Sequence, residues 1–224
     1  AIIGASGKEG RKTLQLLLSE SKNLYDENGT QLRIVAICNS KNILWCKRRE
    51  TDVENLLQRL AEQPTQNQSA EQLLKELSGQ CFDKLIVVDA SASPDIAALY
   101  ERFLAKGIAI VTPNKLANSA GIERFANLKQ LANKQLTPYL YETTVAAALP
   151  IIKPLLDLRR AGDKPKRIEA VLSGTIAFVL DRIQQHIPFS QALAEAVQLV
   201  FAEPDPLQDL SGEDVARKIL ILLR

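Results

Sequence analysis

An acidic stretch near the end of the sequence carries residue types that could do chemistry. Five carboxylates and one lysine lie within residues 203–218, and two prolines stiffen the approach because each fixes φ and lacks an amide donor. Ser211 is a good N-cap residue, and apolar residues follow it at helical spacing. On the predicted helix, Asp214 and Lys218 lie four residues apart on one face, which pairs a proton donor with a carboxylate.

The same residues also permit a purely structural interpretation. Asp214 lies three residues after Ser211 and would complete a capping box. Its pair with Lys218 would then be a surface ion pair worth about a few tenths of a kcal/mol. Spacing alone favours this structural interpretation, so the choice depends on the rest of the chain.

Composition excludes several classes of protein. The chain has 224 residues, of which 46% are hydrophobic and 24% charged, as expected of a soluble globular protein. Its net charge is +2, with no basic run interleaved with aromatic residues, so nucleic-acid binding has no support. No apolar run reaches the length of a membrane span, and no signal peptide is visible. Cys38, Cys46 and Cys81 lack metal-ligand spacing, which favours the reducing cytoplasm.

The first part of the chain predicts an α/β fold, a Rossmann-type doubly wound parallel sheet. A glycine turn at residues 4–10 joins a strand at 1–3 to a helix at 11–21, and an apolar strand follows at 31–39. This strand–turn–helix order is the context that a dinucleotide fingerprint requires. The further predicted elements are helical pieces within 51–79, strands at 84–90, 107–111 and 138–142, and helices at 95–106 and 120–134.

Three loops follow the carboxyl ends of predicted strands, where open α/β sheets bind their ligands. They are the glycine turn, residues 89–94 and residues 112–115. Lys115 is therefore expected over the crevice, although an ordinary loop lysine fits its position equally well.

The chain changes character near residue 145. We expect a dinucleotide-binding domain over residues 1–145 and a smaller α/β substrate domain over 146–224. The absence of methionine, the start within a strand and the end within a helix indicate that both termini are truncated. The second domain is predicted to hold helices at 151–160, 176–185 and 189–200, a strand at 167–172 and the helix after Ser211.

The acidic stretch closely resembles the substrate loop and catalytic helix of homoserine dehydrogenase, and the resemblance covers nearly the whole chain. The family reduces aspartate β-semialdehyde to homoserine with NAD(P)H, on the route to threonine and methionine. The spacing is most similar to the dehydrogenase module of bifunctional aspartokinase–homoserine dehydrogenases, which implies a kinase region upstream and a homo-oligomer such as a dimer. Other matching segments are Thr-Pro-Asn-Lys at 112–115, Tyr-Glu-Thr-Thr-Val at 141–145, Leu-Pro-Ile-Ile at 149–152 and Ser-Gly-Thr at 173–175.

The resemblance implies roles for individual residues. Lys218 and Lys115 would be the catalytic lysines, assisted by Asp214. The substrate would be bound by Glu203, Asp209 and Asp214, and by the backbone of Gly174 and Thr175. The cofactor, NADP or NAD, would be bound by Gly4, Ser6, Gly7, Gly10, Asn39, Ser40, Lys41, Ser91 and Asn114. A sodium ion would be held by Glu142 and the main-chain carbonyls of Val145, Ala147 and Leu149.

General chemistry supports this assignment. The ammonium of a free amino acid needs carboxylate partners once it is buried. Aldehyde reduction needs a proton donor as hydride arrives from the nicotinamide, and a lysine can supply that proton. The second strand also lacks the acidic residue that usually binds the ribose of NAD, and Lys41 could meet a 2′-phosphate, so we expect NADPH to be preferred or accepted.

The chain departs from the family pattern in its glycines. Ser6 and Glu9 stand where glycine is usual, while Gly4, Gly7 and Gly10 form a shifted pattern similar to those of semialdehyde dehydrogenases and dihydrodipicolinate reductases. We therefore expect dinucleotide binding weakened by about tenfold. Ala146 and Ala148 also replace glycines of the family, and Phe201 replaces a tyrosine.

Two alternatives remain open at this point. One is a non-catalytic, regulatory domain that keeps the fold of the family. The other is a different NAD(P) oxidoreductase, of the semialdehyde or dihydrodipicolinate type.

Overall fold

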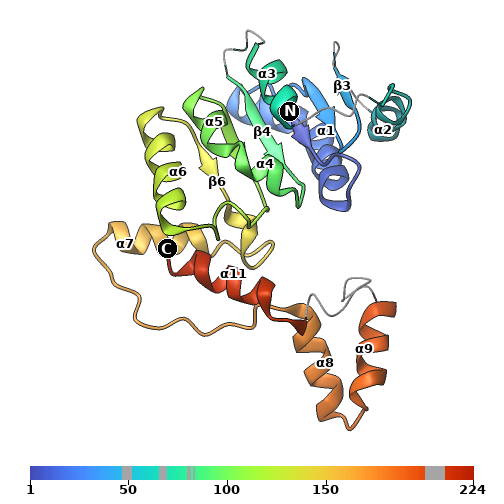
Figure 1. Ribbon diagram of the computed structural model, residues 1–224, viewed down its shortest axis with the longest axis vertical. Coiled ribbons are helices and arrows are strands. Elements are labelled where there is room, and N and C mark those ends of the chain that lie inside the picture. The colour runs from blue at the N-terminus through green and yellow to red at the C-terminus, as the bar shows by residue number, and fades with distance from the viewer. Residues whose placement is uncertain (47–51, 66–69, 80–81, 83, 200–209) are drawn as a thin grey trace. The chain divides into compact units, whose positions relative to one another are not determined.

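The computed structural model describes residues 1–46, 52–65, 70–79, 82, 84–199 and 210–224. It divides into two compact units, unit 1 over Ala1–Tyr141 and unit 2 over Glu142–Arg224 (Figure 1). None of the helices in these ranges is long and apolar enough to cross a membrane.

Unit 1 contains a six-stranded sheet in the order β3-β2-β1-β4-β5-β6. Neighbouring strands are parallel except β2 and β3, which pair antiparallel. This strand order is that of a Rossmann fold, so the predicted fold class is confirmed. The strands are β1 (Ile2–Ile3), β2 (Ala36–Cys38), β3 (Ile43–Trp45), β4 (Ile86–Asp89), β5 (Ala109–Val111) and β6 (Tyr139–Leu140).

Helices connect these strands and supply much of the core. One cluster packs Leu14 of the first helix against Ile2, Ile37 and Leu56, all of them at most 2% exposed. Burying each such side chain contributes about 1.5–3 kcal/mol. The helices of unit 1 are α1 (Lys8–Asn28), α2 (Val53–Ala61), α3 (Ala70–Gly79), α4 (Pro94–Ala98), α5 (Tyr100–Ala105) and α6 (Ile122–Lys134).

Several boundaries in unit 1 differ from those expected. Helix α1 runs on to Asn28, where Gly29 adopts a left-handed conformation with φ 62 and ends it. The strand expected at 31–39 is paired only over Ala36–Cys38. Strand β3 was not predicted, and the helix expected at 95–106 is two helices that meet at Leu99.

All the regular elements of unit 2 in its described residues are helical. Helices α8 (Gly174–Gln184) and α9 (Phe189–Gln198) pack around Val179, Ala192 and Ala196. The other elements are a 3₁₀ turn η1 (Glu142–Thr144), α7 (Ile152–Arg160) and α11 (Glu213–Leu222).

The strand predicted at 167–172 was wrong. Residues 163–173 form no regular element, and most of their side chains are exposed. The alternating pattern suits a strand, but a strand needs hydrogen-bonded neighbours. None pairs with this segment within the described residues.

The glycine turn after β1 fixes how closely helix α1 approaches the sheet. Gly4 has φ +77, and a Cβ there would lie 2.7 Å from the Ala90 carbonyl oxygen. A Cβ on Gly10 would lie 2.2 Å from the Gly4 oxygen, whereas one on Gly7 would make only ordinary contact at 3.4 Å. Gly10 therefore allows the close helix–strand packing that the third glycine of the usual fingerprint provides. Glu9, which stands at the usual position, is exposed.

We expect Gly10→Ala to lower the free energy of unfolding by about 3 kcal/mol, because the new methyl group would overlap the backbone. Gly7→Ala is the control, with a loss below about 1 kcal/mol at this N-cap. Urea unfolding followed by circular dichroism measures both. Equal losses in the two variants would contradict the assignment of close packing to Gly10.

Candidate functional site

A cavity of about 210 Å³ opens at the carboxyl edge of the sheet in unit 1. It lies where β1, β2 and β4 end, which is the edge at which open α/β sheets bind ligands. Burial raises the pKa of Cys38 on its wall to about 12, so this thiol stays neutral. Five of the predicted cofactor residues line the cavity: Gly4, Asn39, Ser40, Lys41 and Ser91.

Asn39 shapes the loop between β2 and β3 from which Lys41 rises. Its side-chain oxygen accepts the backbone N–H of Lys41 and of Asn42, each at 2.9 Å. The buried Asn42 side chain in turn donates to the Leu60 carbonyl at 3.1 Å. This turn holds the exposed Lys41 at the rim of the cavity, where a cation can meet an anionic group.

A buried carboxylate, Asp89, organises the loops that follow β4 and β5. Its Oδ1 accepts the Ser91 N–H at 2.9 Å and the Ser91 hydroxyl at 2.6 Å. Its Oδ2 accepts the Tyr100 hydroxyl at 2.5 Å and the Asn114 amide at 3.3 Å. Burial, followed by the charge of Asp89, raises the pKa of Tyr100 far above its ordinary value, so this phenol stays protonated and donates.

Asn114 lies in this network and not on the cavity wall. Its side chain donates to Asp89 and to the Ser93 carbonyl, and its oxygen accepts the Leu116 N–H at 3.0 Å. Asn114 therefore fixes the backbone on both sides of Lys115, whose own carbonyl accepts the Ser119 N–H at 2.8 Å. The predicted catalytic lysine of unit 1 consequently sits on a rigid loop.

In unit 2 the structure brings Lys218 together with Asp214. The Lys218 Nζ lies 2.7 Å from Asp214 Oδ2 and donates at 2.7 Å to the Leu172 carbonyl. The Lys218 side chain is only 18% exposed while that of Asp214 is 41% exposed, so the lysine end of the pair is the more shielded from water. These two bonds use two of the three ammonium hydrogens.

Leu172 lies two residues before Gly174, the first of the predicted substrate residues at the start of α8. Ser173 caps that helix by accepting the Ile176 N–H at 3.1 Å, Gly174 begins it, and Thr175 is buried. Lys218 is thus anchored to the segment that leads into the predicted substrate contacts. Glu203 and Asp209, predicted to bind the substrate ammonium, lie outside the described residues.

The start of α11 differs from the predicted capping box. Gly212, with φ 74, is the N-cap residue. Ser211 accepts the Glu213 N–H at 3.2 Å. The Asp214 carboxylate pairs with Lys218, a contact that a capping box does not require.

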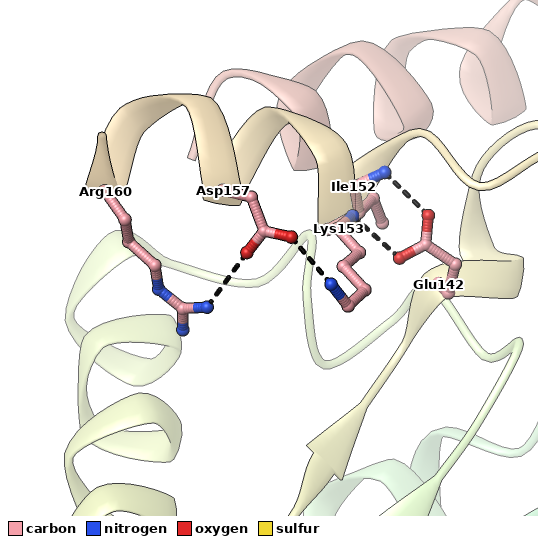
Figure 2. Close-up of polar contacts among 5 residues, drawn as sticks. All are labelled: Glu142, Ile152, Lys153, Asp157 and Arg160. Carbon is pink, nitrogen blue, oxygen red and sulfur yellow. Dashed lines mark hydrogen bonds and ion pairs between the residues drawn. The ribbon is translucent and has the colours of Figure 1, made fainter. Parts of the chain in front are cut away.

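Glu142 caps helix α7. Figure 2 shows its carboxylate facing the first turn, where one oxygen accepts the Ile152 N–H at 2.7 Å and the other the Lys153 N–H at 2.9 Å. A negative charge at this end is favoured by the helix dipole. Further along, Lys153 and, to a lesser extent, Arg160 lower the pKa of the exposed Asp157.

This capping role differs from the predicted role of Glu142 as a sodium ligand. Each carboxylate oxygen accepts one N–H of the helix and keeps a second lone pair, so the sodium role of Glu142 stays a prediction. Ala146 and Ala147 both have positive φ, at 58 and 49, in the loop with Val145 and Leu149. Within the described ranges, no three His, Cys, Asp or Glu side chains gather as metal ligands. The sodium site through main-chain carbonyls stays a prediction.

Profiles of known families match both units. One described as homoserine dehydrogenase, NAD binding domain, matches residues 6–142, and one described as homoserine dehydrogenase matches residues 150–224. The chain belongs to the homoserine dehydrogenase family. The resemblance seen in the sequence is confirmed.

Curated relatives extend well beyond this chain. It is 37% identical over 225 residues to the bifunctional aspartokinase/homoserine dehydrogenase 1, chloroplastic, of Arabidopsis thaliana, covering 100% of the chain and 24% of that protein. It is 34% identical to the bifunctional protein of Haemophilus influenzae, covering 100% of the chain and 27% of that protein. The chain thus spans about a quarter of the length of these relatives.

Solved homoserine dehydrogenases share the fold. A hyperthermophilic archaeal homoserine dehydrogenase in complex with NADPH superposes with a TM-score of 0.80 at 26% identity. That match covers 99% of this chain and 67% of the archaeal one.

The sequence did not reveal every residue of the site. The cavity is also lined by Leu73 of α3 and by Asp95 and Ile96 of α4. Asp89 and Tyr100 were missed as a pair, although an aspartate that ends an otherwise apolar strand signals a buried polar contact.

We expect Glu142→Ala to lower the free energy of unfolding by about 1 kcal/mol, as loss of a helix cap typically does. Hydrogen exchange should quicken at the Ile152 and Lys153 amides, whether or not sodium is present. Asp157→Ala, which removes only exposed contacts of the same helix, should leave both amides protected. A loss of protection that appears only in sodium-containing buffer would instead favour a metal role for Glu142.

Proposed function

We propose that the protein containing this chain interconverts aspartate β-semialdehyde and homoserine with NAD(P)(H). The observation that carries the proposal is the anchored lysine, Lys218, which Asp214 and the Leu172 carbonyl hold beside the start of α8. Family membership and the dinucleotide-type cavity of unit 1 support the same reaction.

Different residues are proposed to donate the proton and to bind the substrate. Bound NAD(P)H supplies the hydride that reduces the aldehyde carbon. We assign proton donation to the carbonyl oxygen to the Nζ of Lys218, which Asp214 orients, and a second cationic contact to Lys115. In the oxidative direction Lys218 takes the proton back from the alcohol. Glu203 and Asp209 are proposed to pair with the substrate ammonium.

The cavity of unit 1 lies beside the glycine turn after β1 and is lined by Gly4, a placement that supports dinucleotide binding. Gly4, Ser6, Gly7 and Gly10 are proposed to cradle the pyrophosphate, and Ser91 to contact it from the next loop. The packing of Gly10 supports retained binding, which weakens the case for a non-catalytic domain.

The similarity to homoserine dehydrogenases also supports proposals on domain organisation, oligomeric state and pathway. We propose a dinucleotide-binding domain over residues 1–145 and a substrate domain over 146–224. A fused aspartokinase region, a homo-oligomer and a role in threonine and methionine synthesis are proposed by analogy with the bifunctional relatives. The three cysteines, Cys38, Cys46 and Cys81, are few and not at metal-ligand spacing, which supports a reducing compartment such as the cytoplasm.

The direct test is an assay of homoserine oxidation by the natural full-length protein with NADP and with NAD. Formation of reduced nicotinamide that depends on homoserine supports the proposal. Dinucleotide binding without turnover would favour the non-catalytic alternative.

We expect Lys218→Ala to lower kcat by about 10²-fold or more, because general acid–base groups contribute that much. Lys218→Arg should keep the ion pair yet remain slow, because a guanidinium does not give up its proton. Arg217→Ala, which removes the neighbouring cation paired with Glu213, is the control and should stay within a few-fold of wild type. Steady-state kinetics decides, and near-normal turnover in Lys218→Ala would remove this lysine from the mechanism.

We expect Lys41→Ala to weaken NADPH binding by about 3- to 10-fold, as the loss of one exposed charge pair implies. Binding of NADH, which lacks the 2′-phosphate, should not change. Lys75→Ala on α3 makes the same change of charge outside the cavity lining and serves as the control. Dissociation constants from fluorescence titration measure the effect, and an equal loss for both nucleotides would contradict it.

A further inference from the structure

We propose that Tyr100 is a positioning residue of unit 1 that acts through Asp89. It fixes the positions of two loops relative to each other, the cofactor loop at residues 89–94 and the catalytic lysine loop at residues 112–115. The proposal rests on the functions assigned above to Ser91 and Lys115. It adds a residue that touches neither substrate nor cofactor.

The Tyr100 hydroxyl joins the ends of two neighbouring strands. It lies 2.5 Å from Asp89 Oδ2 at the end of β4 and 2.8 Å from the Thr112 hydroxyl, which follows β5. Thr112 in turn lies 2.9 Å from the Asp89 carbonyl and accepts the Asn114 N–H at 2.9 Å. Tyr100, Asp89 and Thr112 are all 0% exposed, so water does not compete for these bonds.

The donor comes from outside both loops. Tyr100 is the first residue of α5, and its ring packs edge-on against Tyr139 of β6 with centroids 6.0 Å apart. A rigid helix and a packed ring therefore fix where the hydroxyl lies. Contacts outside the two loops thus help to position the hydroxyl that binds both.

The Asp89 carboxylate links the Tyr100 hydroxyl to both functional loops by hydrogen bonds. One oxygen holds Ser91 by its N–H and hydroxyl, and the other holds Asn114. Asn114 also binds the Leu116 N–H, which brackets Lys115. Without the phenol, a buried carboxylate keeps three of four donors and must turn or admit water to recover the fourth. Either change moves Ser91 and Lys115 together.

Tyr139 provides a matched control within the same sheet. Its buried hydroxyl donates its hydrogen to Asn118 Oδ1 at 2.8 Å, whereas the Tyr100 hydroxyl binds Asp89 and Thr112. Tyr139→Phe and Tyr100→Phe each remove one buried hydroxyl while keeping the ring; the first loses the partner Asn118, and the second loses the partners Asp89 and Thr112. If the role of Tyr100 is purely structural, the two variants should not differ in NADPH binding or in kcat.

The test compares these two variants of the full-length protein by unfolding temperature, by NADPH titration and by steady-state kinetics. Both should unfold at lowered temperatures, Tyr100→Phe by at least as much as Tyr139→Phe because its hydroxyl has two partners. Tyr100→Phe alone should weaken NADPH binding several-fold and lower kcat by about tenfold or more, as small displacements of reacting groups do. The KM for homoserine should change less than kcat. Tyr139→Phe should stay within about twofold of wild type in each kinetic constant.

Equal kinetic losses in the two variants, or wild-type binding and turnover in Tyr100→Phe, would overturn the proposal. If wild type binds NADPH yet does not oxidise homoserine, the proposed function fails, while the NADPH titration still decides whether Tyr100 positions Ser91. Should Tyr100→Phe not fold, Thr112→Val replaces it, because that change removes the hydroxyl joining Tyr100 to Asn114. The same losses are then expected.

Discussion

The carboxylate of Asp89 is the constraint on which the functional edge of unit 1 depends. A fully buried charge costs several kcal/mol unless its oxygens are satisfied, and here four neutral donors satisfy them. Three of those four come from the loops after β4 and β5. The energy that makes the buried charge tolerable is therefore available only when Ser91 and Asn114 occupy their observed positions. The hydrogen bonds that stabilise this edge of the sheet therefore also fix the geometry of the candidate site.

The glycine turn is tied to the same edge by steric contact and not by hydrogen bonds. Gly4 approaches the Ala90 carbonyl so closely that a Cβ would lie 2.7 Å from it, and Gly10 packs on Gly4 in the same way. Ala90 lies between Asp89 and Ser91, so the turn after β1 contacts the loop that the carboxylate organises. Glycine is needed where backbone atoms come into close contact, at Gly4 and Gly10, and not at every position of the usual fingerprint. Glu9 is tolerated because its side chain is exposed.

The sequence predicted best what local pattern controls. Apolar runs located β1, β4 and β5, and the order of elements predicted the Rossmann sheet. Strand β3 was missed because three residues after a polar turn give little periodicity, and the strand at 167–172 was wrong because alternation says nothing about a partner strand. The network around Asp89 joins residues up to 25 positions apart, so no window of sequence contains it.

The two contacts of Lys218 likewise differ in whether local sequence predicts them. Its partner Asp214 lies one helical turn away, and spacing alone predicts that contact. Its other partner, the Leu172 carbonyl, lies 46 residues earlier and follows only from the fold of unit 2. The local contact by itself would describe an ordinary surface pair. The distant one ties the lysine to the backbone that enters α8, and so holds the proposed proton donor close in the chain fold to the predicted substrate contacts.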